Sequence, residues 1–421
     1  MSELPRASIV ENVRFNATGV VPNAVQGIFR RRRNAVRAAG FVDTDGLLIG
    51  LMEGMNRSYD GLPVWVKVVR DDALLMFDPA DIARALSESP EPLAADPEAK
   101  RKGMAHFQPD ALTISRGNDW RSRRKFAESI LGRAPAERVR EVAREEAEAL
   151  LSSLDGELTY EPFNAAIDRI ARRVVLGDAA ADNTDLSDTL AGMQASANSM
   201  PDEPHPEVAA FEAWIERYIE DAEEGSLAAL AADAPQDERT KPRGQLTHWL
   251  FAMGGTVAAN SMRCLVALAS HPERCALATE DPEGYLDACL HETMRLWPTT
   301  NMLSRVSLSD TEWHGETVPS GTQFMVLNHY AHRDRDRVPY ADRFAPEEWT
   351  EGDAASYEGF NHFSRGPQGC PGVALAMLVA RTVVGAALER GIESGSPELD
   401  PSKPLPRMID FFGARVALGH E

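Results

Sequence analysis

Hydrophobic positions recur every three to four residues over most of the chain, which is the spacing of helices with one buried face. This spacing predicts helices at residues 118–132, 135–155, 160–176, 183–199, 205–232, 244–270, 282–297 and 372–390. A shorter helix is predicted at 78–89, with Asp78 as its N-cap and Pro79 at its first position. The chain is therefore predicted to be mostly helical.

Alternation of apolar and polar residues is confined to short stretches. Residues 64–69 and 73–77 flank a polar turn and predict a hairpin, and a second β-rich stretch is predicted at 301–327. Residues 403–419 predict a last hairpin, whereas 90–118, rich in Pro, Asp and Gly, predict a long irregular connection. Strands and helices do not alternate, so we expect a mostly α fold with small β-sheets and no doubly wound sheet.

Composition and charge narrow the classes of partner. The 421 residues are 43% apolar and 26% charged, the balance of a soluble globular protein, and the net charge is −21. Such a charge argues against nucleic acid or an anionic membrane as the main partner. We find no apolar run that we judge long enough to span a bilayer and no signal-peptide core, so we expect a cytoplasmic protein without a membrane partner.

One of the four cysteines stands apart from the others. Cys264, Cys275 and Cys289 lie in apolar helical contexts and are expected to be small buried hydrophobes. Cys370 lies in the segment FSRGPQGCPG, residues 363–372, directly before an apolar helix, and a helix N-terminus lowers the pKa of a thiol. The glycines would let the backbone approach a flat object. This pattern suits a thiolate bound to a metal in a planar cofactor, and the alternative is a capped turn with an inert thiol.

The same ten residues resemble the cysteine-ligand loop of cytochrome P450 enzymes, FxxGxxxCxG, with matches at Phe363, Gly366, Cys370 and Gly372. The resemblance implies one cytochrome P450 domain over residues 1–421, haem b as cofactor and Cys370 as the axial ligand of the haem iron. It also implies monooxygenation, most simply hydroxylation, of a small substrate with O2 and two electrons.

A second motif, HETMRLWP at residues 291–298, resembles the ExxR element of the family. Glu292 and Arg295 are three residues apart and share a helix face. Arg343, in a segment that resembles the PxRF type, would complete a Glu–Arg–Arg cluster. The role implied for this cluster is structural.

The resemblance also implies residues that bind the haem propionates. Trp120 and Arg124 match the WxxxR element of the helix beside the haem, and Arg305 matches a second propionate-binding arginine. The family usually has His or Arg two residues before the ligand cysteine, where this chain has Gln368, which brings no charge. His106 is a candidate substitute donor, and the alternative is a solvated loop histidine.

The helix at 246–273 resembles the oxygen-activating helix of the family, usually [AG]-G-x-[DE]-T. Thr256 keeps the alcohol, and Gly255 replaces the acid. The alternative for Thr256 is a hydroxyl bonded back to the carbonyl four residues earlier. We expect monooxygenation with altered proton delivery. Peroxide-driven or nitric-oxide-linked chemistry, a non-catalytic haem-binding sensor and a cysteine hydrolase remain alternatives.

The same helix face would line a substrate pocket, together with residues that follow the ExxR helix. The candidate substrate contacts are His248, Phe251, Ala252, Thr300, Asn301 and Met302. Their polar members favour a polar natural-product substrate of secondary metabolism. We also expect a basic surface that docks a ferredoxin, itself reduced by a ferredoxin reductase, or else a merely solvated basic helix, formed by Arg121, Arg123, Arg124, Lys125 and Arg365.

Overall fold

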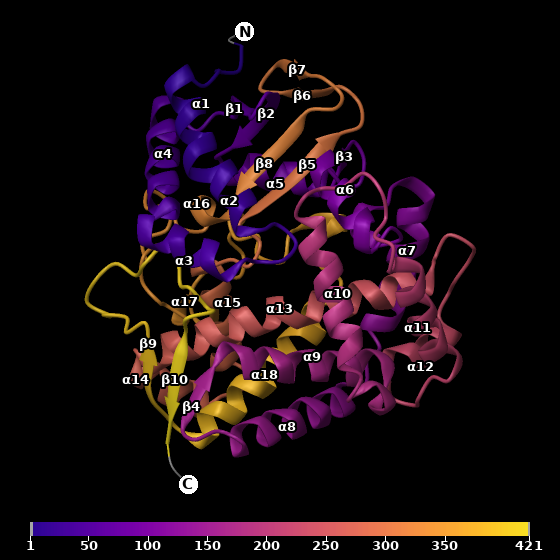
Figure 1. Ribbon diagram of the computed structural model, residues 1–421. Helices are drawn as coiled ribbons and strands as arrows, with labels where there is room; N and C mark the ends of the chain where they lie inside the picture. The colour runs from indigo at the N-terminus through magenta and orange to yellow at the C-terminus, as the bar shows by residue number, and fades with distance from the viewer. Residues whose placement is uncertain (1–2, 420–421) are drawn as a thin grey trace. The chain divides into compact units, whose positions relative to one another are not determined.

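The computed structural model describes residues 3–419, which fall into two compact units, each described here by itself. Unit 1 holds the described residues up to 101 together with 294–370 and 405–410. Unit 2 holds 102–293, 371–404 and the described residues from 411. Helices predominate in both and the sheets are small (Figure 1), which confirms the predicted fold class.

Unit 1 is built on a five-stranded sheet with the strand order β1-β2-β8-β5-β3. Strands β1 and β2 form the predicted hairpin, β2 runs parallel to β8, and the other pairs are antiparallel. The strands are β1 (Val64–Val68), β2 (Asp71–Met76), β3 (Leu93–Ala94), β5 (Met302–Ser307) and β8 (Gln323–Leu327). A separate hairpin joins β6 (Thr311–Trp313) to β7 (Glu316–Val318).

Both faces of this sheet are covered, because apolar side chains of its strands point to both sides. Val66 and Leu75 pack with α4 (Thr44–Ser58) on one side, and the alternate residues Trp65 and Leu74 pack with α5 (Pro79–Ser87) on the other. The N-cap of α5 is Asp78, as predicted, and its carboxylate accepts from the N–H of Ala80 at 2.9 Å.

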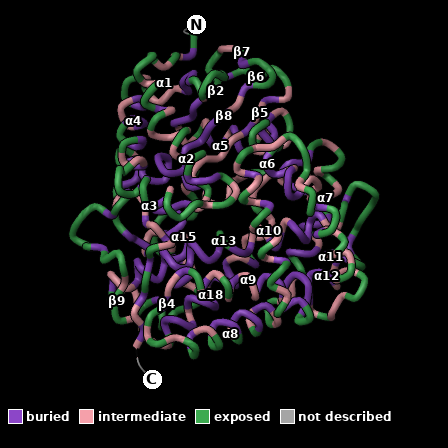
Figure 2. Tube along the Cα trace, in the orientation of Figure 1, coloured by how far each residue is buried: buried purple, intermediate pink, exposed green. Residues whose placement is uncertain are grey.

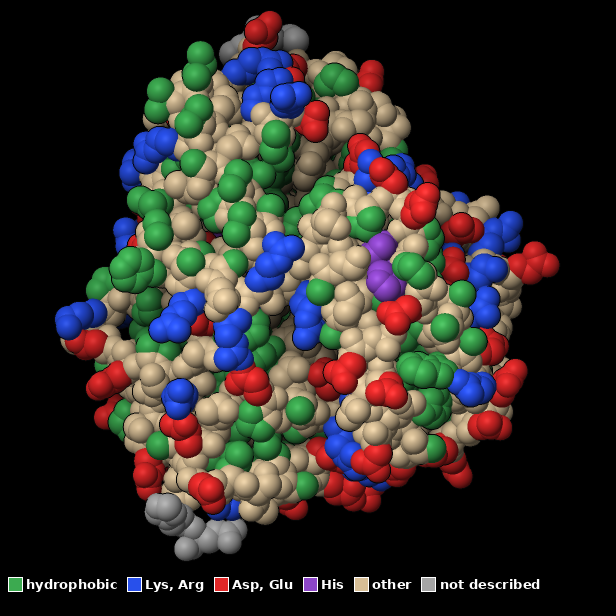
Figure 3. All heavy atoms as spheres, viewed as in Figure 1, with side chains coloured by type: hydrophobic (Ala, Val, Ile, Leu, Met, Phe, Trp, Pro, Cys, Tyr) green, Lys and Arg blue, Asp and Glu red, His purple; other side chains and the backbone are tan. Residues whose placement is uncertain are grey.

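The N-terminal helices of unit 1 were not predicted from the sequence pattern. They are α1 (Ile9–Phe15), a π-helical turn (Asn16–Val20), α2 (Val21–Gln26) and α3 (Arg33–Val42), followed by α4. These helices leave several large apolar side chains exposed (Figure 3), among them Ile9, Val10, Val13, Val25, Phe41 and Val42. Because their apolar positions do not all face inward, the helical periodicity of this segment is weak.

One predicted irregular stretch is partly helical. Within 90–118 the structure has α6 (Glu98–Phe107) and a 3-10 turn (Leu112–Ile114). The first half of α6 is a run of charged residues, which hid its periodicity, whereas Met104 and Phe107 are buried. The remaining short elements of unit 1 are α16 (Asn328–Ala331), α17 (Glu347–Thr350) and a 3-10 turn (Gly366–Gln368).

Unit 2 is organised around the long helix α13 (Pro242–Ala269), which is buried over most of its length (Figure 2). It packs against α9 (Tyr160–Leu176), α18 (Val373–Arg390) and α11 (Val208–Glu220). The other elements are α7 (Gly117–Leu131), α8 (Ala136–Ser152), a 3-10 turn (Asp178–Ala180), α10 (Thr184–Ala197), α12 (Leu227–Asp233) and α14 (Pro272–Glu280). Along the chain, α15 (Tyr285–Leu296) leads from unit 2 into unit 1.

Helix α13 corrects the expectation that no apolar segment is long enough to span a bilayer. Among the described helices it is the one that is long and apolar enough, by length and composition alone, to cross a membrane. Its apolar window is 78% buried inside the structure, as in the core helix of a globular unit.

Two further predictions for unit 2 were wrong. The single helix predicted at 205–232 is two helices, because Gly225 (φ 85°) interrupts it and Ser226 caps α12 by accepting from the N–H of Ala229. The hairpin predicted at 403–419 is absent from the described residues. Instead β10 (Arg415–Leu418) pairs with β9 (Ile392–Ser396) and with β4 (Glu157–Thr159), so its partners are distant in sequence.

Candidate functional site

The cysteine loop, residues 363–372 in the sequence, is a tight turn that leaves Cys370 exposed. The backbone N–H of Cys370 donates to the carbonyl of Phe363 at 2.9 Å. Gly366 has a φ of 70°, and a Cβ on it would lie 2.5 Å from the carbonyl oxygen of Leu86 on α5. Glycine is therefore required where the loop turns against α5, and the turn presents the thiol in a fixed position.

The other cysteines differ from Cys370 as the sequence predicted. Cys264 and Cys289 are fully buried, and Cys275 is half-buried. Burial raises the pKa of Cys264 to about 12 and holds the pKa values of Cys275 and Cys289 above their ordinary range. These three thiols remain protonated at neutral pH, which leaves Cys370 as the candidate metal ligand.

Two residues that flank Cys370 were expected to contact the cofactor. The hydroxyl of Ser89 donates to the Oε1 atom of Gln368, so this amide is oriented by a neighbour within unit 1. Gly372 is the N-cap of α18, which places Cys370 two residues before that helix cap. The thiol thus precedes a helix N-terminus, as predicted.

Arg305 connects strand β5 to the cysteine loop. Its Nη2 atom donates to the hydroxyl of Ser364 at 3.0 Å, and its Nη1 atom donates to the carbonyl of Ser304 at 3.0 Å. Its Nε atom is buried and has no hydrogen-bond partner within residues 3–419. Burial lowers the pKa of this guanidinium to about 10. A buried arginine with an unused donor is suited to an anionic ligand.

A second cation, Lys100, lies close enough to Arg305 for the two charges to repel each other. The ammonium group of Lys100 donates to the carbonyl of Ala95 at 2.9 Å. Burial, and then the charge of Arg305, lowers the pKa of Lys100 to about 7, although Asp96 acts in the opposite direction. An anion bound beside both cations would relieve this repulsion. Lys100 was not predicted from the sequence as a site residue, because it lies in the segment expected to be irregular.

In unit 2, one face of α13 stays uncovered. Between residues 244 and 268 of this helix, the positions that are not buried are His248, Phe251, Ala252, Gly255 and Thr256. Their spacing of three and four residues places them in a single stripe. All five were predicted from the sequence to line the pocket or to take part in catalysis, and the structure brings them together on one face.

The hydrogen bonds within this stripe are local. The hydroxyl of Thr256 donates to the carbonyl of Ala252, which is the bond that the alternative interpretation of this residue predicted. The Nδ1 atom of His248 lies 2.9 Å from Oε1 of the buried Gln108, which fixes the orientation of the ring. Its neighbour Phe251 packs edge-on against Phe107.

Helix α13 is kinked beside this stripe. Gly254 has a φ of −64° and a ψ of −105°, outside the helical range, so two helical segments meet there. The Gly254-Gly255 pair explains the kink, because glycine is the residue that most readily leaves helical geometry and helix kinks occur at such pairs.

The helix α7 presents Trp120 and Arg124 one turn apart. Trp120 is half-buried, and the Nε atom of Arg124 donates to Oε1 of Glu128 at 2.7 Å. Their assignment to the propionates remains a prediction. The structure argues against the same role for His106. Its Nδ1 atom lies 2.6 Å from the carbonyl oxygen of Glu203 and its Nε2 atom 2.9 Å from a serine hydroxyl, so both ring nitrogens are already used.

Arg295 of the ExxR element holds a segment of unit 1 together. Glu292 and Arg295 are both fully buried on α15. The guanidinium of Arg295 donates to four backbone carbonyls at 2.9–3.3 Å, those of His332, Tyr340, Ala341 and Arg343. The side chain of Arg343 is exposed, so the expectation that it completes a Glu–Arg–Arg cluster is corrected: this residue contributes its carbonyl.

Arg333, in the same segment as Arg343, is a buried arginine. Arg333 is 1% exposed and donates to Oδ1 of Asp342 at 2.8 Å. Arg407 pairs with the same carboxylate at 2.8 Å. The sequence has a dense run of Arg and Asp at 333–343 that could have indicated this ion-pair cluster. Only Arg343, the last residue of the run, was assigned a role from the sequence.

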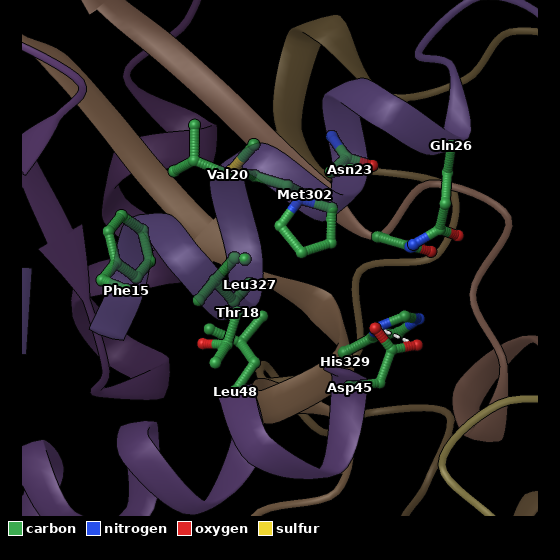
Figure 4. Close-up of a pocket in the computed structure, with 13 residues that line it drawn as sticks. Phe15, Thr18, Val20, Asn23, Gln26, Asp45, Leu48, Met302, Leu327 and His329 are labelled. Carbon is green, nitrogen blue, oxygen red and sulfur yellow. Dashed lines mark ion pairs between the residues drawn. The ribbon is translucent and has the colours of Figure 1, made fainter. Parts of the chain in front are cut away.

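A pocket in unit 1 contains two of the predicted substrate contacts. Asn301 and Met302 line it, and its empty space, open solvent at the mouth included, is about 460 Å³. The carboxylate of Asp45 and the imidazole of His329, 3.4 Å apart, form its polar end (Figure 4). Phe15, Val20, Leu48 and Leu327 line the apolar part. Thr300 is not part of this lining, and its carbonyl accepts from the side chain of Asn328.

The predicted basic surface is smaller than expected. Arg121 and Lys125 are exposed on α7, but Arg123 is 7% exposed. Its guanidinium donates to the carbonyl of Arg239 at 3.0 Å and to Oδ1 of Asp110 at 2.6 Å. Arg123 is therefore a structural residue rather than a docking contact.

Comparison with known proteins agrees with this geometry. Residues 284–391 match the family model described as Cytochrome P450. Cytochrome P450 3A17 of Cavia porcellus is 30% identical over 149 residues, which is 30% of this chain and 30% of the relative. Lithocholate 6-beta-hydroxylase of Mesocricetus auratus is 29% identical over 161 residues, 33% of this chain and 32% of the relative. The chain thus matches about a third of the length of these curated relatives.

The fold extends the likeness over most of the chain. The crystal structure of cytochrome P450DA heme domain superimposes with a TM-score of 0.69 at 16% identity, covering 82% of this chain and 86% of that one. Residues 284–391 are thus similar to the cytochrome P450 family, and the chain has the fold of a cytochrome P450 heme domain. This family uses haem b.

The residues in place fit that cofactor. Cys370 offers an exposed thiol on a fixed turn, and Arg305 and Lys100 offer positive charge for a haem propionate in the same unit. The unused Nε donor of Arg305 is the most specific feature, because a buried guanidinium nitrogen without a partner is costly unless a ligand accepts from it.

Proposed function

We propose that this chain is a haem-thiolate monooxygenase that hydroxylates a small or medium polar natural-product-type substrate with O2 and two electrons. The observation that carries the proposal is the cysteine loop. Its one exposed thiol, Cys370, is fixed by the backbone bond to Phe363, and the neighbouring Ser364 accepts from the anion-binding Arg305.

The protein residues would hold the cofactor by charge and by ligation. Cys370 would be the axial ligand, and Arg305 and Lys100 would bind propionate oxygens, as would Trp120 and Arg124 of α7. When bound, a thiolate-ligated haem supplies oxygen activation, and electron donation from sulfur favours O–O cleavage. Gln368, whose amide carbonyl accepts from Ser89, would contribute at most a neutral N–H.

The exposed stripe of α13 would carry the polar chemistry on the protein side. The hydroxyl of Thr256 donates to the carbonyl of Ala252 and keeps its lone pairs to accept a hydrogen bond. It can therefore hold a water molecule at Oγ1. His248, oriented by Gln108, would orient a polar group of the substrate. Gly255 supplies no acid, which is the observation that favours peroxide-driven turnover as the alternative.

The substrate class follows from the polar residues near apolar ones. The Asp45–His329 pair forms one end of a pocket that Asn301 and several apolar side chains also line, an arrangement that suits an amphipathic ligand with hydrogen-bonding groups. A role in secondary metabolism remains part of the proposal.

Electrons would come from a ferredoxin reduced by a ferredoxin reductase, and we propose a cytoplasmic location. Exposed Arg121 and Lys125 on α7 support docking of an acidic partner, because opposite charges steer association. Replacing both by Gln should slow reduction by ferredoxin at low salt and leave reduction by dithionite unchanged. An unchanged ferredoxin rate would contradict docking at α7.

The test of the function is a spectral titration of the purified ferric protein. Polar terpenoids, aromatic amino acids, polyketides and fatty acids are added in turn, and the Soret band is followed. A low-to-high-spin shift with one class, followed by oxygen-dependent product formation with ferredoxin and its reductase, supports monooxygenation. Product formed only with hydrogen peroxide supports the peroxide-driven alternative. A protein that binds haem but shows neither shift nor product contradicts the proposal.

A further inference from the structure

Gly255 brings no acid to α13, but an acidic residue of a different helix lies close to this position. Asp168 belongs to α9, which packs along α13 in unit 2. A Cβ built on Gly254 would lie 2.5 Å from the Oδ1 atom of Asp168. The carboxylate therefore approaches the backbone of α13 at the kink, two residues before Thr256.

A chain of hydrogen bonds along α9 orients this carboxylate. The hydroxyl of Tyr160 donates to Oδ1 of Asn164 at 3.1 Å, and the Nδ2 atom of Asn164 donates to Oδ2 of Asp168 at 2.8 Å. The three residues follow one another at intervals of four, so they lie on one face of α9. The ring of Tyr160 is buried and packs against Phe411, with centroids 4.8 Å apart, which anchors the start of the chain.

The two glycines of α13 fit this arrangement individually. Any side chain at Gly254 would collide with the carboxylate of Asp168. A Cβ at Gly255 would lie 3.8 Å from the hydroxyl of Tyr160 and 3.9 Å from Oδ1 of Asn164, which is ordinary contact. Hence buried Gly254 leaves room for the carboxylate of Asp168, and exposed Gly255 has no side chain where the family usually places an acid.

We propose that Asp168 supplies protons through the Gly254–Gly255 kink, in place of the acid absent from position 255, and that Asn164 and Tyr160 are its positioning residues. The inference rests on the proposed monooxygenase function. That reaction consumes one O2, two electrons from the redox partner and two protons, and it yields the hydroxylated substrate and one water. Asp168 takes up each proton from solvent and then releases it toward α13, which returns the side chain to the carboxylate form.

One nearby cation bears on the charge of Asp168. Arg172 follows it by one turn on α9, and the charge of Asp168 partly offsets the effect of burial, which lowers the pKa of Arg172. The guanidinium of Arg172 is bonded to the carbonyl of Ala181 and to the hydroxyl of Ser187. A cation therefore lies one turn from Asp168 on the same helix.

The first test is structural and independent of turnover. We expect Gly254→Ala to lower the Tm of the haem-loaded protein by several degrees, because the new methyl group meets the carboxylate of Asp168. In the Asp168→Ala background the same substitution should lower the Tm clearly less. An equal loss of Tm in both backgrounds would show that Asp168 does not approach α13 as described, and would overturn the proposal.

The second test separates proton supply from packing. Asp168→Asn preserves the shape of the side chain and should lower the yield of product per electron consumed by about tenfold or more with O2. Turnover with hydrogen peroxide, which brings its own protons, should not change. Adding Gly255→Asp to Asp168→Asn should restore most of the lost coupling. The matched control is Asp182→Asn, a surface carboxylate paired with Arg169, which should have no effect on coupling.

The outcomes distinguish a failure of the proposed function from a failure of the role of Asp168 alone. If the wild-type protein forms no product with O2 or with peroxide, the proposed function fails and the role of Asp168 fails with it. If the wild-type protein turns over but Asp168→Asn keeps wild-type coupling, only the role of Asp168 is overturned. Failure of Gly255→Asp to restore coupling, in a variant with unchanged Tm, would also overturn it.

Discussion

Arg305 and Ser364 are 59 residues apart in the sequence and are joined by a hydrogen bond of 3.0 Å. The bond links strand β5 of the sheet to the loop that carries Cys370. The same guanidinium has a buried Nε atom without a partner among the described residues. Arg305 therefore holds the loop and also has a hydrogen-bond donor available to bind an anion. Loop position and cofactor binding are therefore expected to depend on one side chain.

Replacing Arg305 should weaken haem binding. We expect Arg305→Gln to speed haem release to a scavenging apo-globin by about 10- to 100-fold, since a charge-assisted hydrogen bond contributes about 1.5–3 kcal/mol. Ser364→Ala removes the bond to the loop but keeps the charge, so its effect should be smaller. The exposed Arg415→Gln, on β10, is the control and should release haem at the wild-type rate. Equal release rates for all four proteins would contradict the assignment.

The stability of the haem-free protein should depend on pH through Lys100. Its pKa is lowered from 10.5 to about 7 in the folded state, so between these pH values the unfolded chain binds more protons than the folded one. Stability should accordingly rise with pH across this window, and the gain is lost as the pH falls through about 7. Urea unfolding should show a flatter profile for Lys100→Met.

Haem binding should change the pKa of Lys100 and therefore the pH dependence of stability. A propionate beside the ammonium group favours its charged form and raises its pKa again. The rise of stability between pH 7 and 10.5 should therefore shrink in the haem-loaded protein. A profile that is the same with and without haem would argue that Lys100 does not face the cofactor.

Arg295 and Arg343 give a matched pair for stability. Arg295→Met should destabilise the protein by about 3–5 kcal/mol, because it leaves buried carbonyls of residues 332–343 without their donor. Arg343→Ala should change stability by no more than about 0.5 kcal/mol, since its side chain is exposed. Urea denaturation of the two variants checks both values. A large loss of stability in Arg343→Ala would contradict the structure and support the Glu–Arg–Arg cluster expected from the sequence.

Much of the fold could be predicted because its patterns are strong and local. Helices such as α9 and α13 have long apolar periodicity, and the β1–β2 hairpin has a polar turn between apolar runs. The stripe of α13 from His248 to Thr256 was predicted as one face because helical spacing alone determines it. Cys370 was identified because a cysteine among glycines and prolines has few structural explanations.

The rest depends on contacts between distant residues. The pairing of β10 with β9 and β4, the burial of Arg123, and the engagement of His106 by Glu203 are not encoded in any short pattern. Lys100 lies in a charged run that looks solvated, and Asp168 is one of many acidic residues on helices. Their positions follow from tertiary packing, so only the structure identifies them.

The most direct test of the account is the absorption spectrum of the reduced, carbon-monoxide-bound protein after reconstitution with haem. The wild-type chain should show the red-shifted Soret band of a thiolate-ligated haem, and Cys370→Ala should lose that band. Cys275→Ala, which removes a half-buried thiol, should keep the wild-type spectrum. A thiolate spectrum that survives in Cys370→Ala, or a wild-type chain that binds no haem, would contradict the central claim that Cys370 is the ligand of a haem-thiolate enzyme.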